Sequence, residues 1–202
     1  MATPARRFDR AYYDRYYRDP ATRVTDRTAV KKVARLVAAW TDYLELPVRT
    51  ILDIGCGVGH WRAAARECWP RARWYGVEFS EYLCRKHGWT HGSIAEFAPA
   101  EQLGCATFDL VVCQGVLQYV DDRDAQRAMR NLAQWTDGAL YFEALTQQDW
   151  ERHCDRTRTD GDVHLRRGAW YRRRLARDFQ TCGGGVFVNR RAGCILFEFE
   201  GA

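Results

Sequence analysis

The chain has 202 residues, 47% of them hydrophobic, which is enough for the core of one domain and excludes a pair of large ones. Its formal charge of +5 comes from 31 basic and 26 acidic side chains, a modest excess that identifies no partner by itself. The sequence contains no apolar run long enough to cross a bilayer and no signal-peptide stretch, so we expect a cytoplasmic protein. The eight cysteines show no paired C-x-x-C spacing, which favours buried free thiols over disulfides or a metal site.

Two segments precede the first expected strand. Residues 8–17 are dense in tyrosine and in charges of both signs, a composition that fits packing as well as ligand contact. From Arg27 to Leu44, apolar residues recur at steps of three and four, which predicts an amphipathic helix that packs on a sheet and is ended by Pro47. We expect a single domain in which residues 1–45 form a helical extension or lid and residues 49–202 form the core.

The most informative stretch is Ile51–Gly59, an apolar strand followed by three alternating glycines and a helical segment. Glycine at positions 55, 57 and 59 removes the Cβ atoms that would keep a ligand from the backbone and permits the positive φ of a tight turn. The spacing differs from the dinucleotide fingerprint G-x-G-x-x-G, because His60 stands where its third glycine would be. The carboxylate of Asp53 would repel a pyrophosphate but would suit an ammonium group or an ordered water near it.

A second acid follows at the distance that one strand-helix-strand unit imposes. Arg73–Glu78 predicts the next strand, and Glu78 comes 78 − 55 = 23 positions after Gly55, close to the separation of about 20 in dinucleotide-binding folds. The two oxygens of its carboxylate can accept hydrogen bonds from two ribose hydroxyls. Two later apolar runs, Phe108–Cys113 and Gly138–Glu143, predict buried parallel strands.

The last quarter of the chain predicts helices, a loop and a hairpin. Thr146 and Asp149 have the spacing of a reciprocal helix cap at the start of a short helix. Residues 155–167 are polar and aperiodic, which predicts a loop, and a helix should span about Ala169 to Phe179. The chain should then pass through Gly183–Gly185 into a β-hairpin built from Val186–Asn189 and Cys194–Glu200.

These motifs together resemble class I S-adenosylmethionine (SAM)-dependent methyltransferases, from about Arg49 to the C-terminus. The resemblance implies an α/β fold of three layers, Rossmann-like, with a mostly parallel seven-stranded sheet and a C-terminal antiparallel hairpin. It implies SAM as cofactor, with S-adenosylhomocysteine as product and no metal. Tyr17 and Arg23 match a tyrosine and an arginine that related enzymes carry on an N-terminal lid, and Ser93 stands where the family commonly has an acid beside adenine. The resemblance implies these cofactor-binding residues: Tyr17, Arg23, Asp53, Gly55, Cys56, Gly57, Glu78, Phe79, Ser93, Ile94, Cys113 and Gln114.

The motifs identify the cofactor better than the methyl acceptor. We expect His153 and Tyr119 as catalytic candidates and Gln118, Trp150 and Arg156 as substrate contacts, although a lone histidine is more often structural. The arginine-rich stretch Arg152–Arg177 is either a solvated face or a clamp for an acidic small molecule. A small-molecule acceptor is the main hypothesis, and the chain shows no appended domain for recognising nucleic acid. An RNA methyltransferase and an inactive SAM-binding partner subunit remain as alternatives, whereas the glycine spacing excludes a dehydrogenase.

Overall fold

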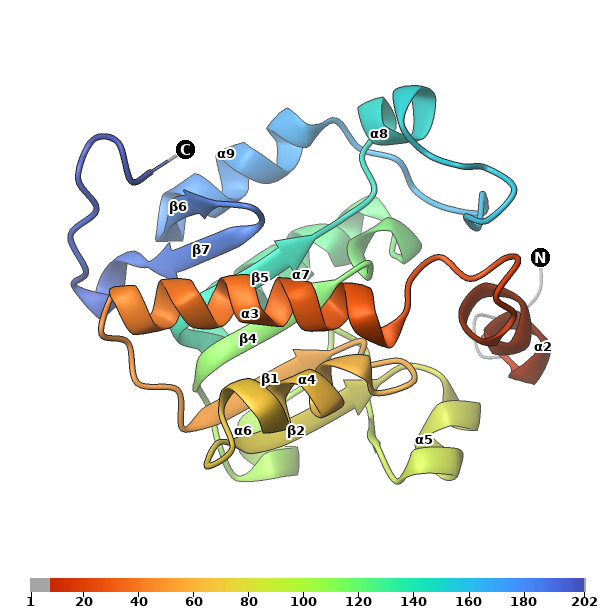
Figure 1. The fold of residues 1–202 in the computed structure, drawn as a ribbon, viewed down its shortest axis with the longest axis horizontal. Helices are drawn as coiled ribbons and strands as arrows, with labels where there is room; N and C mark the ends of the chain where they lie inside the picture. The colour runs from red at the N-terminus through yellow and green to blue at the C-terminus, as the bar shows by residue number, and fades with distance from the viewer. Residues whose placement is uncertain (1–7, 202) are drawn as a thin grey trace.

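The computed structural model describes residues 8–201, which form a central sheet between two layers of helices (Figure 1). In this part of the chain the sheet has seven strands in the order β3-β2-β1-β4-β5-β7-β6. The first five strands pair in parallel, whereas β7 runs antiparallel to both β5 and β6. This order confirms the mostly parallel Rossmann-like sheet with an antiparallel C-terminal pair. The strands are β1 Thr50–Ile54, β2 Arg73–Glu78, β3 Thr90–His91, β4 Phe108–Gln114, β5 Thr136–Glu143, β6 Phe179–Gly183 and β7 Val186–Asn189.

Helices cover both faces of the sheet, and none within residues 8–201 is long and apolar enough to span a bilayer. All eight cysteines are free thiols, and three of them are buried. The α-helices are α2 Arg10–Tyr13, α3 Arg27–Tyr43, α4 His60–Cys68, α5 Glu81–His87, α6 Pro99–Leu103, α7 Asp122–Trp135, α8 Gln147–Arg152 and α9 Gly168–Asp178. Three short turns of other helical type are η1 Asp14–Arg18, η2 Leu117–Tyr119 and η3 Arg190–Ala192.

Alternation along the strands divides the core into two clusters. Leu52 and Ile54 of β1 pack with residues of α7 and α9 on one face, while Ile51 packs with residues of α3 and α4 on the other. Because helices cover both faces, the central strands are apolar on both sides, as their sequence predicts. The helix α3 therefore belongs to the core, and of the described N-terminal residues only 8–26 precede it.

The helix α3 begins at the predicted residue and ends one residue before the predicted Leu44. Asp26 caps it by accepting a hydrogen bond from the Ala29 N–H at 2.9 Å. The helix stops at Tyr43, four residues before Pro47, and the chain turns at Glu45, whose φ is 55°. The expectation that Pro47 ends the helix is wrong, because the reversal occurs before the chain reaches the proline.

The C-terminal hairpin forms one strand earlier than expected. Its strands are β6 and β7, so the partner of Val186–Asn189 is Phe179–Gly183 rather than Cys194–Glu200. The three glycines at 183–185 have φ of 87°, 59° and 82°, so they form the reversal itself instead of leading into it. The segment 194–200 lies outside the sheet, and its Phe197 and Phe199 are 72% and 98% exposed.

Candidate active site

Polar side chains lie at the carboxyl ends of four neighbouring strands. Asp53 precedes the last residue of β1, while Glu78, Gln114 and Glu143 are the last residues of β2, β4 and β5. Gln114 and Glu143 are direct register partners. Since these strands run parallel, the four side chains share one edge of the sheet, the edge at which open α/β sheets bind ligands.

The glycines of the turn after β1 have two roles: two of them leave room for side chains of the protein, and one leaves the backbone open to a ligand. Gly55, Gly57 and Gly59 have φ of 76°, 53° and 82°. A Cβ on Gly55 would lie 2.3 Å from Val116 Cγ2, and one on Gly59 would lie 3.0 Å from the Trp89 ring, so both make room for side chains of the protein. A Cβ on Gly57 would have Gly55 O at 4.0 Å as its nearest neighbour. The backbone at Gly57 is therefore the part of the turn that a ligand can approach.

The carboxylate of Glu78 is buried and hydrogen-bonded at the end of β2. The residue is only 5% exposed. The Gly57 N–H donates to Glu78 Oε2 at 2.7 Å, while the Ser80 N–H at 2.9 Å and the Tyr13 hydroxyl at 3.3 Å both donate to Oε1. Burial raises the pKa of Glu78, and the backbone donors oppose this by stabilising the ionised form.

Aromatic side chains from the N-terminal segment cover this end of the sheet. The Phe8 ring centroid lies 5.0 Å from that of Tyr12, 5.3 Å from that of Tyr119 and 6.3 Å from that of Phe79. The hydroxyls of Tyr12 and Tyr119 are 2.9 Å apart, and the Ser80 hydroxyl donates to Phe8 O at 2.6 Å. Residues 8–13 therefore lie over Glu78 and close it from solvent.

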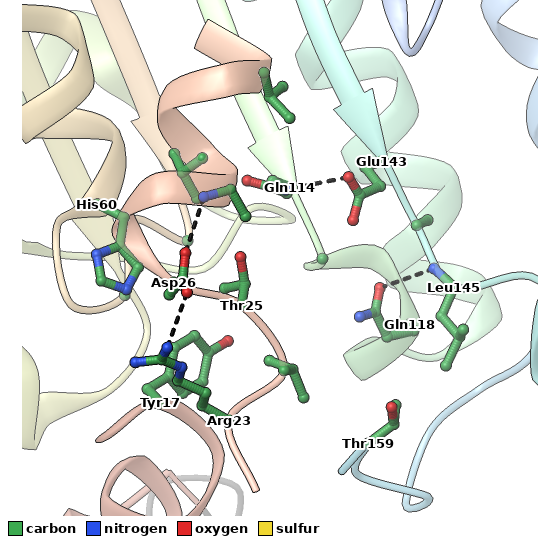
Figure 2. A pocket seen from close by; sticks show the side chains of 18 of the residues that line it. Tyr17, Arg23, Thr25, Asp26, His60, Gln114, Gln118, Glu143, Leu145 and Thr159 are labelled. Atoms are coloured by element: carbon green, nitrogen blue, oxygen red, sulfur yellow. Dashed lines mark hydrogen bonds and ion pairs between the residues drawn. The ribbon is translucent and has the colours of Figure 1, made fainter. Parts of the chain in front are cut away.

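A cavity of about 960 Å³ opens beside the covered end, bounded by the strand ends, the start of α3 and the segment 153–159 (Figure 2). Small-molecule sites span roughly 300–1,000 Å³, so this cavity can hold a cofactor together with a small acceptor. Ten residues expected from the sequence line it: Tyr17, Arg23, Asp53, Gly55, Cys56, Gly57, Gln114, Gln118, Tyr119 and His153. Seven others do not line it: Glu78, Phe79, Ser93, Ile94, Cys113, Trp150 and Arg156.

Some of the residues outside the cavity lining serve the fold. Cys113 is fully buried and Ile94 is 3% exposed, both in the core cluster shared with α7. The Ser93 hydroxyl accepts a hydrogen bond from the Ala95 N–H at 3.3 Å, which shapes the turn after β3. Glu78 and Phe79 differ from these, because the N-terminal aromatic residues lie between them and solvent.

The arginine-rich stretch contributes one guanidinium to the cavity lining, that of Arg158. Arg156 stacks on Trp150 at 5.2 Å and donates to its carbonyl, so both act in holding the loop. Arg166 has a side chain only 5% exposed, and it donates to Leu117 O at 2.8 Å and Val120 O at 2.7 Å. The stretch therefore forms no guanidinium cluster in the cavity.

The expected lid residues line the cavity from the N-terminal side. Burial raises the pKa of Tyr17, and the nearby Tyr119 adds to the effect. The Arg23 guanidinium pairs with Asp26 at 3.0 Å. Figure 2 shows Tyr17 and Arg23 on the segment before α3, apart from Gln114 and Glu143 at the strand ends. In this state Arg23 serves the cap of α3, and a ligand carboxylate would compete with Asp26 for it.

Several lining residues were not expected individually as site residues, among them Asp26, His60, Trp61 and Glu143, whereas Arg158 belongs to the stretch Arg152–Arg177 that was expected to border the acceptor. Glu143 is the last residue of its strand, as Glu78 is of β2. This position could have identified Glu143 from the sequence as a candidate site residue. His60 follows the glycine turn directly; burial lowers its pKa, and its Nε2 is buried without a hydrogen-bond partner among the described residues. Nothing local distinguishes Arg158 from the other arginines near it.

Asp53 is buried beside the glycine turn, with a side chain 2% exposed. Its Oδ2 has no hydrogen-bond partner in the described part of the chain. Burial raises the pKa of Asp53, and the nearby Glu78 raises it further. An orphaned carboxyl oxygen next to an open glycine backbone fits the ammonium end of SAM, so the residues present suit this cofactor.

The sheet order, the glycine turn and the acids at the strand ends are those of the class I SAM-dependent methyltransferase fold. The chain belongs to the Methyltransferase domain family, which it matches over residues 13–191. The match begins in α2, well ahead of Arg49, where the sequence motifs first indicated the resemblance.

Comparison with known proteins gives the same class. Trans-aconitate 2-methyltransferase of Azoarcus sp. (strain BH72) is 32% identical over 80 residues, which cover 36% of this chain and 30% of that protein. The sugar N-methyltransferase KedS8 from Streptoalloteichus sp ATCC 53650 is 26% identical with a TM-score of 0.50, over 66% of this chain and 53% of that one. The PH0226 protein from Pyrococcus horikoshii OT3 has a TM-score of 0.61 at 13% identity, over 89% and 97% of the two chains, and shows the fold. The chain thus spans less than two thirds of the first two relatives.

Proposed function

We propose that this methyltransferase acts on a small molecule. The observation that carries the proposal is the cavity, which continues from the glycine turn past Gln114 to Glu143 and is walled by residues 153–159. A concave site of this kind surrounds a small acceptor, whereas a polymer needs an open surface to lie on. The names of two relatives, a trans-aconitate methyltransferase and a sugar methyltransferase, also specify small molecules.

In this proposal the cofactor extends along the strand ends. Glu78 accepts hydrogen bonds from the ribose hydroxyls, the backbone at Gly57 lies against the ligand, and Asp53 faces the ammonium group. Arg23 pairs with the carboxylate once it leaves Asp26, and residues 8–26 act as a lid. SAM, when bound, supplies an electrophilic methyl group. The chain has to align the acceptor with that group and keep water out, and alignment is the larger contribution.

Three residues on the cavity wall orient the acceptor in this proposal: Gln118, Tyr119 and His153. The Leu145 N–H donates a hydrogen bond to Gln118 Oε1 at 3.5 Å, and Gln118 is only 8% exposed. Its side chain is therefore held in place. His153 ends α8 on the solvent side of the cavity, where an imidazole can take a proton from a hydroxyl or ammonium acceptor near neutral pH.

Two measurements test the proposal. Calorimetry should show binding of S-adenosylhomocysteine and no comparable binding of NAD. With SAM carrying a labelled methyl group, label should enter the small-molecule fraction of a cell extract and not its RNA. Label found in RNA alone would overturn the small-molecule acceptor, and preferential binding of NAD would overturn the cofactor assignment.

A further inference from the structure

A directional hydrogen-bond chain ends at Glu143 on the open side of the cavity. Trp61 Nε1 donates to Gln114 Oε1 at 2.7 Å, and Gln114 Nε2 donates to Glu143 Oε2 at 3.1 Å. Because the indole N–H can only donate, it determines which end of the Gln114 amide faces which neighbour. The Tyr141 hydroxyl donates to the same Glu143 oxygen at 2.7 Å. The network therefore presents donors to Glu143 and holds it as an acceptor.

The other oxygen of this carboxylate is available to a ligand. Among the described residues no hydrogen bond or ion pair involves Glu143 Oε1, and the side chain is exposed to the cavity. Figure 2 shows this second oxygen pointing away from Gln114. Two fixed donors on one oxygen orient the carboxylate, so the remaining lone pairs have a defined direction.

The other carboxyl groups on the cavity lining either accept hydrogen bonds within the protein or are buried. Asp26 and Asp149 cap helices, Asp155 accepts hydrogen bonds from Thr157, and Asp53 is 2% exposed. The two guanidinium groups on the lining are also engaged. Arg23 pairs with Asp26, and Arg158 donates to Pro20 O at 3.3 Å through one terminal nitrogen, while its buried Nε has no partner among the described residues.

Position along the sheet assigns Glu143 to the acceptor rather than the cofactor. The order β2-β1-β4-β5 places Glu78 at one end of the row of strand-end residues and Glu143 at the other. If the ribose lies at β2 and the ammonium group at β1, the reacting methyl group lies toward β4. The acceptor then lies over β4 and β5, within reach of Glu143.

We infer that Glu143 is a specificity-determining residue that binds an amino group of the acceptor, so that the enzyme takes small amines. The inference rests on the proposed function. An ammonium group both donates to Oε1 and balances the charge of the carboxylate, and such charge-assisted bonds are about twice as strong as neutral ones. A carboxylate acceptor would meet five carboxyl side chains on the lining against two guanidinium groups, each of which already holds a partner within the protein.

The test uses the full chain saturated with S-adenosylhomocysteine and three probes that share one ring: cyclohexylamine, cyclohexanol and cyclohexanecarboxylate. Ligand-observed NMR titration at neutral pH gives a dissociation constant for each. We expect the amine to bind at least about tenfold more tightly than the carboxylate, the equivalent of one charge-assisted hydrogen bond. Glu143→Gln keeps the shape and should remove most of that preference.

Asp137→Asn is the matched control, because it removes an exposed carboxylate at the opposite end of the same strand. It should leave the preference unchanged. A wild-type protein that shows no preference for the amine overturns the inference without any variant, and so does a preference that survives Glu143→Gln. If S-adenosylhomocysteine itself fails to bind the wild type, the proposed function fails; if it binds while the carboxylate is preferred, only the amine anchor fails.

Discussion

The two ends of the ligand site are built alike at the strand ends but covered differently. At β2, Glu78 is 5% exposed and its two oxygens accept three hydrogen bonds, one of them from Tyr13 of the N-terminal segment. At β5, Glu143 has two donors on one oxygen and faces a cavity. The β2 end is thus covered by aromatic side chains of the same chain, whereas the β5 end is open to the cavity.

In the proposed function the cavity lining omits part of the binding site, because the protein covers Glu78 with its own side chains. Residues 8–13 lie over Glu78 through ring contacts and two hydroxyl bonds, which a ligand can displace without disturbing the sheet. Cofactor binding should therefore shift the equilibrium of this short segment rather than of the core.

Glu78→Ala should have the largest effect, and it tests whether the covered end is part of the site. Two ribose hydroxyls would lose a charged acceptor, which costs roughly 1.5–3 kcal/mol, or about 10–150-fold in the dissociation constant of S-adenosylhomocysteine. Calorimetry measures this, with circular dichroism to verify folding. The control is Glu81→Ala, which removes an exposed acid paired with Arg85. An unchanged dissociation constant in folded Glu78→Ala would show that the covered end binds no ribose.

Arg166→Leu tests the role of Arg166 in stabilising the segment around Gln118 and Tyr119, which lines the open end of the cavity. Its buried guanidinium donates to Leu117 O, Val120 O and His164 O, and these carbonyls would lose their donor. We expect a loss of about 1–3 kcal/mol in the free energy of unfolding, measured with urea. Asp122→Asn removes the charged partner, which is 80% exposed, and should cost roughly 0–1 kcal/mol. Equal losses in the two variants would contradict a role for the carbonyl contacts.

Asp53 lies on β1, between the two ends, and Asp53→Asn tests how its carboxyl group makes the stability of the protein depend on pH. Burial raises the pKa of Asp53 in the folded state, so folding takes up a proton once the unfolded carboxyl ionises. The stability that this group contributes is complete below about pH 4 and falls by about 1.4 kcal/mol per pH unit up to the folded pKa. Urea unfolding across this range should show less loss with rising pH in Asp53→Asn than in wild type. Parallel pH profiles would mean that the pKa of Asp53 is not raised by folding.

Tyr13→Phe should have the smallest effect. It tests whether the Tyr13 hydroxyl competes with the ribose for Glu78 or supports the bound cofactor. The Tyr13 hydroxyl bonds Glu78 Oε1 at 3.3 Å, so a ribose hydroxyl must displace it. Removing it while keeping the ring should tighten S-adenosylhomocysteine binding by roughly 0.5–1.5 kcal/mol, the net value of one hydrogen bond. Tyr16→Phe, in the same segment, is the control. Weaker binding in Tyr13→Phe would indicate that the hydroxyl supports the bound cofactor instead.

Features that depend on local pattern were predicted well from the sequence. The strand ranges around Ile51, Arg73, Phe108 and Gly138, the positive φ of the glycine turn and the start of α8 all follow from neighbouring residues. The sequence also predicted the class of enzyme, because the glycine turn and Glu78 come from one strand-helix-strand unit.

What the sequence alone determined are the elements whose causes lie within about twenty residues: the apolar strands, the glycine turn and the acids at the carboxyl ends of β1 and β2. The tertiary structure decided which segments meet. It paired β7 with Phe179–Gly183, brought Tyr13 to Glu78, and placed Glu143 instead of Arg156 on the cavity lining. Each of these depends on packing between segments far apart in the chain, and local propensity carries no information about such contacts.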